Sequence, residues 1–274
     1  MNVLWGFLIT AGATAVAVTV MLLVRRRAPE GSWFQDGDRA SGVFGVLATG
    51  FSVLLGFIIF LAFTSYDQSR SGAETEALVL TQQVETAQFF PAAVRGELTG
   101  ELICYGRSVV YDEWERMEAG TQGDALNPWG VELFETIQGV EPRSNSEQSA
   151  YDKWLEQTSE REAARQDRIH GAVGVIPSPL WVVLFFIGAV IFLYMLFFAD
   201  SGEGPVTQAM LMGAITSVIV VMLLLLSFLD SPFHSGLGGV RPVAMERTLR
   251  IVDEALAATD IRTTVPCDAE GNAS

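Results

Sequence analysis

Four long apolar segments alternate with polar stretches along the chain, and none of the four contains Asp, Glu, Lys or Arg. They cover residues 3–24, 42–65, 178–198 and 206–229. A helix of about 20 apolar residues crosses the ~30 Å hydrocarbon core of a bilayer, so each segment is long enough to span it. The pattern predicts an all-α membrane protein with four transmembrane helices in a lipid bilayer.

The polar region between the second and third spans, residues 66–177, has helical periodicity throughout. Apolar or small side chains at Ala73, Ala77, Leu80 and Val84 extend the second span beyond the bilayer as one long helix. A helix over about 92–118 is expected to follow. Two further helices have start signals, Asn127-Pro128 for one and the capping box Ser144-Asn-Ser-Glu147 for a helix over about 145–171. The fold class is therefore four membrane helices with a helical domain inserted between the second and third.

This pattern divides the chain into four parts. Residues 1–65 hold the first membrane helix pair, 66–177 the inserted domain, and 178–229 the second membrane pair. The tail, 230–274, has one amphipathic helix over about 242–258 and a small, polar end that we expect to be disordered. Trp114, Met117, Leu133, Phe134, Trp154 and Leu155 are among the side chains expected to face the core of the inserted domain.

Charge is concentrated in the inserted domain. The net charge is −15, and residues 66–177 hold 20 acidic side chains against nine basic ones. Such a domain repels polyanions, so nucleic acid is not an expected partner. The acidic runs Glu74/Glu76 and Asp112/Glu113/Glu115 are interpreted as solvated helix faces, because neighbouring residues on a helix point apart.

Basic residues bear on orientation. Arg25-Arg26-Arg27 follows the first span directly, and arginine resists translocation. This places the N-terminus and the acidic domain outside the cytoplasm, although Arg70, Arg165 and Arg168 lie close to the membrane on the opposite side and nearly balance the count. Cys104 and Cys267 fall on one side of the membrane in either orientation. They could form a disulfide if that side is oxidising, but the sequence favours two unrelated thiols.

The second span has a face of small side chains. Gly45, Thr49, Ser52 and Gly56 recur at intervals of four, three and four residues. Small residues at this spacing let helix backbones approach closely, which is the favoured interpretation. The alternative is a pore lined by this face, with Phe60 or Phe63 as a hydrophobic constriction.

Catalysis has little support in the sequence. The two histidines, His170 and His234, are far apart, and no Cys/His cluster has zinc spacing. No glycine-rich loop resembles a phosphate cradle, and no nucleophile elbow is present. We expect no enzyme, no metal and no cofactor. Because no span holds an ionisable residue, a proton-coupled transporter, a voltage sensor and a cation pump are also disfavoured.

Several stretches resemble a widespread bacterial family labelled bestrophin-like, over roughly residues 40–258. They are Tyr66-Asp-Gln-Ser-Arg70 with Glu74, Glu76 and Ala77; Tyr105-Gly-Arg-Ser-Val-Val-Tyr-Asp-Glu-Trp114; Glu160-Arg-Glu-Ala-Ala-Arg165; Ile176-Pro-Ser-Pro-Leu-Trp-Val; and Leu229-Asp-Ser-Pro-Phe233.

Bestrophins proper are oligomeric anion channels with four spans, a cytosolic helical domain after the second span, and a pore lined by that span. The resemblance therefore implies a homo-oligomer in the bacterial cytoplasmic (inner) membrane, an inorganic anion as a partner, and Phe51, Phe60 or Phe63 as constriction candidates. The resemblance implies no calcium-binding residues, because the calcium-binding motif of bestrophins is not matched in this sequence. The alternative is a membrane-anchored helical sensor or scaffold that transports nothing.

Overall fold

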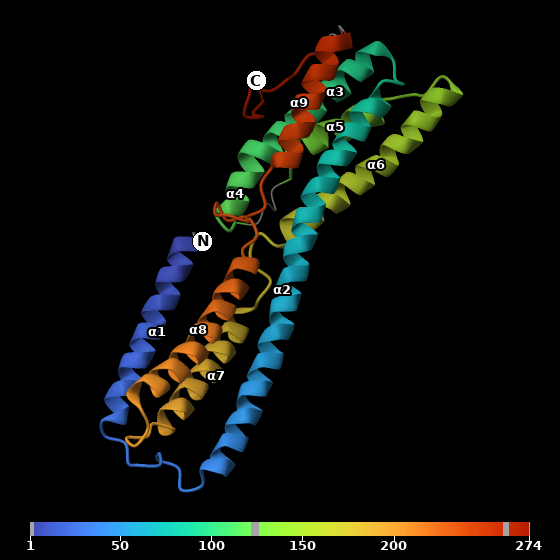
Figure 1. Ribbon diagram of the computed structural model, residues 1–274. Helices are drawn as coiled ribbons and strands as arrows, with labels where there is room; N and C mark the ends of the chain where they lie inside the picture. Colours follow the sequence, from blue (N-terminus) through green and yellow to red (C-terminus); the bar gives the residue numbers. More distant parts are fainter. Residues whose placement is uncertain (1–2, 122–125, 260–262, 274) are drawn as a thin grey trace. The chain divides into compact units, whose positions relative to one another are not determined.

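The computed structural model describes residues 3–121, 126–259 and 263–273 (Figure 1). In chain order its helices are α1 (Val3–Arg25), α2 (Gly37–Ala87), α3 (Ala92–Ser108), a π-helical turn η1 (Val109–Glu113), α4 (Trp114–Glu118), α5 (Pro128–Gln138), α6 (Asn145–His170), α7 (Ser178–Phe197), α8 (Pro205–Leu229) and α9 (Val243–Thr259). Within the described residues the β-structure is one isolated bridge, between Cys267 and Ala273. The predicted all-α class is confirmed.

The chain forms two compact units. The membrane unit comprises Met1–Thr64 and Val175–Asp230, and the polar unit comprises Ser65–Gly174 and Ser231–Ser274. Among the described residues, α1, α2, α7 and α8 are long and apolar enough to cross a membrane. They agree with the four predicted segments to within a few residues, except that α2 begins at Gly37 and runs on to Ala87, as its extended periodicity indicates.

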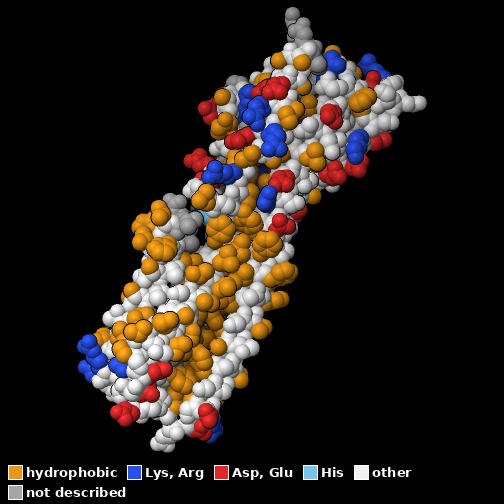
Figure 2. Space-filling model, in the orientation of Figure 1, with side chains coloured by type: hydrophobic (Ala, Val, Ile, Leu, Met, Phe, Trp, Pro, Cys, Tyr) orange, Lys and Arg blue, Asp and Glu red, His pale blue; other side chains and the backbone are white. Residues whose placement is uncertain are grey.

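The membrane unit exposes most of its apolar surface. In Figure 2 hydrophobic side chains cover its visible face, and charged side chains gather at its end near the α1–α2 connection. Inside it, α1 packs along α8, where Thr14 and Ser217 share a hydrogen bond of 3.0 Å. The loop after α1 meets the α7–α8 loop where the Ser201 N–H donates to the Pro29 carbonyl at 3.3 Å, and the side chain of Arg25 at the end of α1 donates from Nη2 to the Ser201 carbonyl at 3.0 Å.

The described residues of the polar unit form a hydrophobic core. Leu80 of α2, Leu102 and Tyr105 of α3, and Trp154 of α6 are almost fully buried in it. Trp114, Met117 and Leu133 are buried as expected, whereas Phe134 and Leu155 were wrongly expected in the core and are 49% and 41% exposed. These two lie one position along the helix from Leu133 and Trp154, which take the inward places.

Both predicted helix starts are confirmed. The Asn127 side chain accepts from the Trp129 N–H at 3.1 Å, and Pro128 occupies the first turn of α5. Ser144 Oγ accepts from the Glu147 N–H at 3.2 Å, and Glu147 Oε2 reaches back to the Arg143 N–H at 2.7 Å. These caps satisfy N–H groups that have no partner inside the helix.

The end of the chain differs from the expectation of disorder. Residues 263–273 lie against α3 and α5, where the Trp129 indole N–H donates to the Gly271 carbonyl at 2.7 Å. The side chain of Asp268 accepts from the backbone N–H of Glu270 and of Asn272 at 3.0 and 2.8 Å. A buried indole and a local turn therefore order a segment whose small, polar composition gave no sign of it.

Candidate functional site

The small-residue face of α2 is uncovered within one chain. Gly45, Thr49, Ser52 and Gly56 are exposed, and a Cβ built on either glycine would meet no atom within 4 Å. Phe60 and Phe63 continue this face and are 62% and 52% exposed. The face therefore has no partner among the described residues, and its role stays a prediction.

The opposite face of α2 is the one that packs within the chain. Phe51, Leu55, Ile58 and Ala62 are each at most 5% exposed. Phe51 thus lies away from Phe60 and Phe63, against neighbouring helices of the membrane unit. It is the weakest of the three constriction candidates.

Cys104 and Cys267 are joined in a disulfide, with their Cα atoms 5.8 Å apart. The structure thus has the pairing that the sequence left as the less favoured alternative. The bond links α3 to the C-terminal segment across 163 residues of sequence. Sequence spacing could not reveal it, because the contact depends on how the tail folds back.

A buried charge cluster lies at the centre of the polar unit. The Arg168 guanidinium, fully buried on α6, donates to Glu76 of α2 through Nε at 2.5 Å and Nη2 at 3.1 Å. It also donates to Glu113 of η1 at 2.5 Å, and Arg165 donates to the same carboxylate at 3.2 Å. The interpretation of these acidic runs as solvated faces is therefore wrong for Glu76 and Glu113.

Their neighbours along the chain do face solvent. Glu74 pairs with Arg70 on the surface of α2, and Asp112 pairs with Arg116, with all four side chains at least 44% exposed. Only one residue of each acidic run, Glu76 in one and Glu113 in the other, belongs to the buried cluster. The π-helical turn η1 contributes to this difference, because its extra residue per turn changes the direction in which the side chains point.

Aromatic and amide groups complete the cluster. The Tyr105 hydroxyl donates to Glu76 Oε1 at 2.6 Å, and the Asn127 amide donates to Glu113 Oε1 at 2.9 Å. The Arg161 guanidinium lies 4.6 Å from the centre of the Tyr105 ring and donates to Gln83 at 2.9 Å. Each buried carboxylate therefore has several donors, as a buried ion pair requires.

The pKa values follow from this geometry. Burial alone would raise the pKa of Glu113, but the charges of Arg168 and Arg165 lower it below its ordinary value. Burial and the nearby Glu76 carboxylate raise the pKa of Tyr105 well above its ordinary value. Glu113 is thus held as the anion and Tyr105 as the neutral phenol. We interpret the cluster as the element that fixes the register of α6 against α2 and η1.

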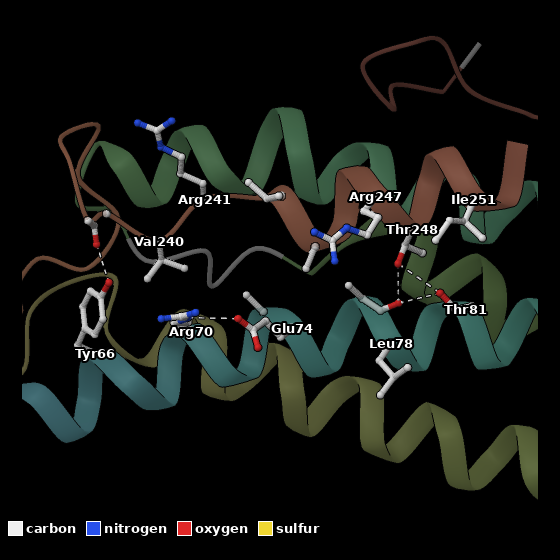
Figure 3. A pocket seen from close by; sticks show the side chains of 16 residues that line it. Tyr66, Arg70, Glu74, Leu78, Thr81, Val240, Arg241, Arg247, Thr248 and Ile251 are labelled. Carbon is white, nitrogen blue, oxygen red and sulfur yellow. Dashed lines mark hydrogen bonds and ion pairs between the residues drawn. The ribbon is translucent and has the colours of Figure 1, made fainter. Parts of the chain in front are cut away.

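A groove of about 800 Å³ lies between α2 and α9 in the polar unit. Figure 3 shows Arg70 and Glu74 of α2 on one side and Arg247 of α9 on the other. Thr248 Oγ1 donates to the Ala77 carbonyl at 3.1 Å and holds the two helices together at the floor. Arg241 also lines this groove, so it gathers basic side chains on an otherwise acidic chain.

Candidate metal ligands do not converge in the described part of the chain. No group of three His, Cys, Asp or Glu side chains is placed there to hold a metal ion.

Comparison with known proteins agrees with this architecture. A bestrophin-like domain model matches residues 3–245. No curated protein matches. Among solved structures, the chain is similar to a bacterial bestrophin homologue from Klebsiella pneumoniae carrying a point mutation, with a TM-score of 0.64 and 13% identity over 92% of this chain and 99% of that one. Another mutant of that homologue gives a TM-score of 0.66 at 12% identity, covering 93% and 98% of the two chains.

A structure described as that of a membrane protein is similar at a TM-score of 0.67 and 14% identity, covering 89% of this chain and 97% of the other. At these identities the solved structures show a shared fold, and the family model covers most of the chain. The resemblance seen in the sequence is confirmed: this multi-pass membrane protein belongs to the bestrophin-like domain family.

Proposed function

We propose that this protein is a homo-oligomeric anion channel whose pore is lined by the exposed face of α2. One observation carries the proposal: Gly45, Thr49, Ser52 and Gly56 are uncovered on a helix whose opposite face is buried within the chain. One chain leaves this face open, so several copies around an axis would enclose it.

The chemistry of the face suits an uncharged pathway. Thr49 and Ser52 carry hydroxyls that can donate to an anion, and residues 42–65 contain no ionisable side chain. Phe60 and Phe63 would form the hydrophobic constriction, which controls conduction by excluding water. The same small residues also suit close helix packing between copies, which would place the pore elsewhere.

Anion flux from liposomes tests the channel. Full-length protein is reconstituted, and chloride and nitrate efflux is measured with Phe60→Ala, Phe63→Ala and the control Phe57→Ala. Phe57 is 60% exposed but projects from a different side of α2. We expect both test variants to raise flux while the control leaves it unchanged. Absence of flux across pH and calcium concentration would count against transport.

We further propose that residues 66–177 and the 230–274 tail form one inserted domain outside the cytoplasm, with the protein in the bacterial inner membrane. The Cys104–Cys267 disulfide supports this, because disulfides persist in oxidising compartments. Arg25-Arg26-Arg27 supports it as well. Arg165 and Arg168, which nearly balance that cluster in the count of basic residues, are paired with buried carboxylates.

Cysteine labelling tests the orientation. Intact cells are mildly reduced and treated with a membrane-impermeant maleimide, with denatured lysate as the control for accessibility. We expect labelling in intact cells. Labelling that appears only when the cells are permeabilised under native conditions would place the domain in the cytoplasm. Labelling that needs denaturation would instead reflect burial, because Cys104 and Cys267 are 0% and 8% exposed.

The second candidate is a membrane-anchored scaffold or sensor without transport. The basic groove between α2 and α9 favours it, because a groove of about 800 Å³ with Arg70, Arg241 and Arg247 could hold an acidic partner. Neither candidate is an enzyme. Light scattering after size exclusion separates them, because a monomer has too few spans to enclose a pore and would favour the scaffold.

A further inference from the structure

A second cavity, of about 550 Å³, lies away from both the charge cluster and the basic groove. It is bounded by α3, α5 and the C-terminal segment of the polar unit. Three carboxylates line it, from Glu97 and Glu101 of α3 and Glu132 of α5, together with the apolar side chains of Trp129 and Pro266. No cationic side chain is among its lining residues in the described part of the chain.

Glu101 is the unusual member of this group. It is 5% exposed, and its Oε1 accepts from Thr136 Oγ1 at 2.8 Å. Its Oε2 is buried and has no hydrogen-bond partner among the described residues. A buried acceptor without a partner costs free energy, so the cavity contains an unsatisfied site for a donor.

The surroundings oppose a negative charge at this position. The pKa of Glu101 is raised to about 7, chiefly by burial and also by the charges of Glu97 and Glu132, against a lowering by the Thr136 hydrogen bond. The buried carboxyl therefore holds its proton at a higher pH than an ordinary glutamate does. A bound cation would reverse both effects, because it would supply a donor and offset the charge of the neighbouring carboxylates.

The C-terminal segment makes this cavity a preformed one. A Cβ on Gly100 would lie 2.1 Å from the Thr264 carbonyl oxygen, so the segment runs directly against the backbone of α3. The Cys104–Cys267 disulfide and the hydrogen bond from Trp129 to Gly271 hold it there. One wall of the cavity is thus fixed by a covalent bond.

The lining groups indicate the class of cation. The carboxylates of the described residues do not form a group that could hold a metal ion. Carboxylates beside an indole can instead bind an organic ammonium group, through charge-assisted hydrogen bonds and contact with the aromatic ring. A cavity of 550 Å³ is also large enough for a small organic molecule.

We propose that the cavity between α3, α5 and the C-terminal segment binds a small organic amine, with Glu101 as its buried anchor and Glu97 and Glu132 at its entrance. A diamine suits the arrangement, because one ammonium group donates to Glu101 Oε2 while the second lies between the exposed carboxylates. This site does not depend on transport, and its test does not measure flux.

Isothermal titration of the full-length protein in detergent tests the site, with 1,4-diaminobutane as the probe. At pH 7, titrations in two buffers of different ionisation enthalpy report protons exchanged on binding. We expect saturable binding accompanied by proton release, because the amine converts the protonated fraction of Glu101 to the anion. Magnesium chloride at equal ionic strength is the control for screening of the acidic surface.

Three variants locate the signal. Glu101→Gln should abolish proton release and weaken binding about tenfold or more, as expected on losing a charge-assisted hydrogen bond. Glu132→Gln, at an exposed position, should weaken binding without affecting folding. Glu135→Gln, on the same helix but outside the cavity, should bind as wild type does. Equal binding by all variants, no saturable heat, or the same signal from magnesium would overturn the proposal. If Glu101→Gln does not fold, two other results test the proposal. Wild type should release protons on binding, and Glu132→Gln should bind more weakly than wild type.

Discussion

Replacing Arg168 by Met is the sharpest test of the buried charge cluster. Arg168 is fully buried and bonds to Glu76 and Glu113, so Arg168→Met leaves two buried carboxylates with much less counter-charge. Removing one partner of a buried ion pair typically costs about 3–5 kcal/mol. For a unit of this size a loss of 1 kcal/mol lowers Tm by about 2–4 °C, so we expect Tm to fall by about 10 °C.

The pH dependence identifies the cause. In wild type the lowered pKa of Glu113 means that its contribution is present at neutral pH and is lost as pH falls through the folded-state pKa. In Arg168→Met only the charge of Arg165 remains to counteract the effect of burial, so the pKa of Glu113 rises. The carboxyl can then become neutral in mild acid, and the difference in Tm between variant and wild type should shrink between about pH 7.5 and pH 5.

Thermal unfolding of the full chain in detergent, followed by tryptophan fluorescence at a fixed scan rate, measures this difference. Arg116→Met is the matched control, because Arg116 forms an exposed pair with Asp112 and should contribute less than about 1 kcal/mol. Equal losses in the two variants, or a loss for Arg168→Met that does not change with pH, would refute the assignment of a buried, charge-balanced cluster.

Three other substitutions give distinct outcomes. Gly56→Leu adds bulk where one chain has open space, so folding should not change. If this face lines the pore, we expect lower anion flux from an unchanged oligomer; a weaker oligomer on native gels would assign the face to packing between copies instead. Trp114→Ala removes a side chain that is 3% exposed and should cost about 3–5 kcal/mol, seen as a lower Tm. Gly100→Ala would force the Thr264 carbonyl away from α3, so added protease should cleave the C-terminal segment faster than in wild type. Wild type with its disulfide reduced is the comparison for a released segment.

Local signals predicted most of the fold. The spans follow from runs of about 20 apolar residues, and the starts of α5 and α6 follow from Asn127-Pro128 and Ser144 with Glu147. The continuation of α2 to Ala87 follows from unbroken helical periodicity with no proline before Pro91, although Gly72 lies within it. Each of these features is decided by residues close together in sequence.

The candidate sites were less predictable because their partners are distant in sequence. Glu113 meets Arg168 across 55 residues, and Glu76 meets it across 92. From sequence, Glu76 and Glu74 are equivalent members of one acidic run, and tertiary packing alone separates the buried from the exposed one. A signal was available in α6, where Arg161, Arg165 and Arg168 recur at helical spacing on one face.

The disulfide has a consequence for the order of biosynthesis. Cys104 is made before α7 and α8, and Cys267 after them, so the bond closes a loop that contains both of these membrane helices. If just one of these helices crossed the bilayer, the two thiols would lie on opposite sides and could not pair. The disulfide therefore requires an even number of crossings between the two cysteines, which means that α7 and α8 must behave as a pair during insertion.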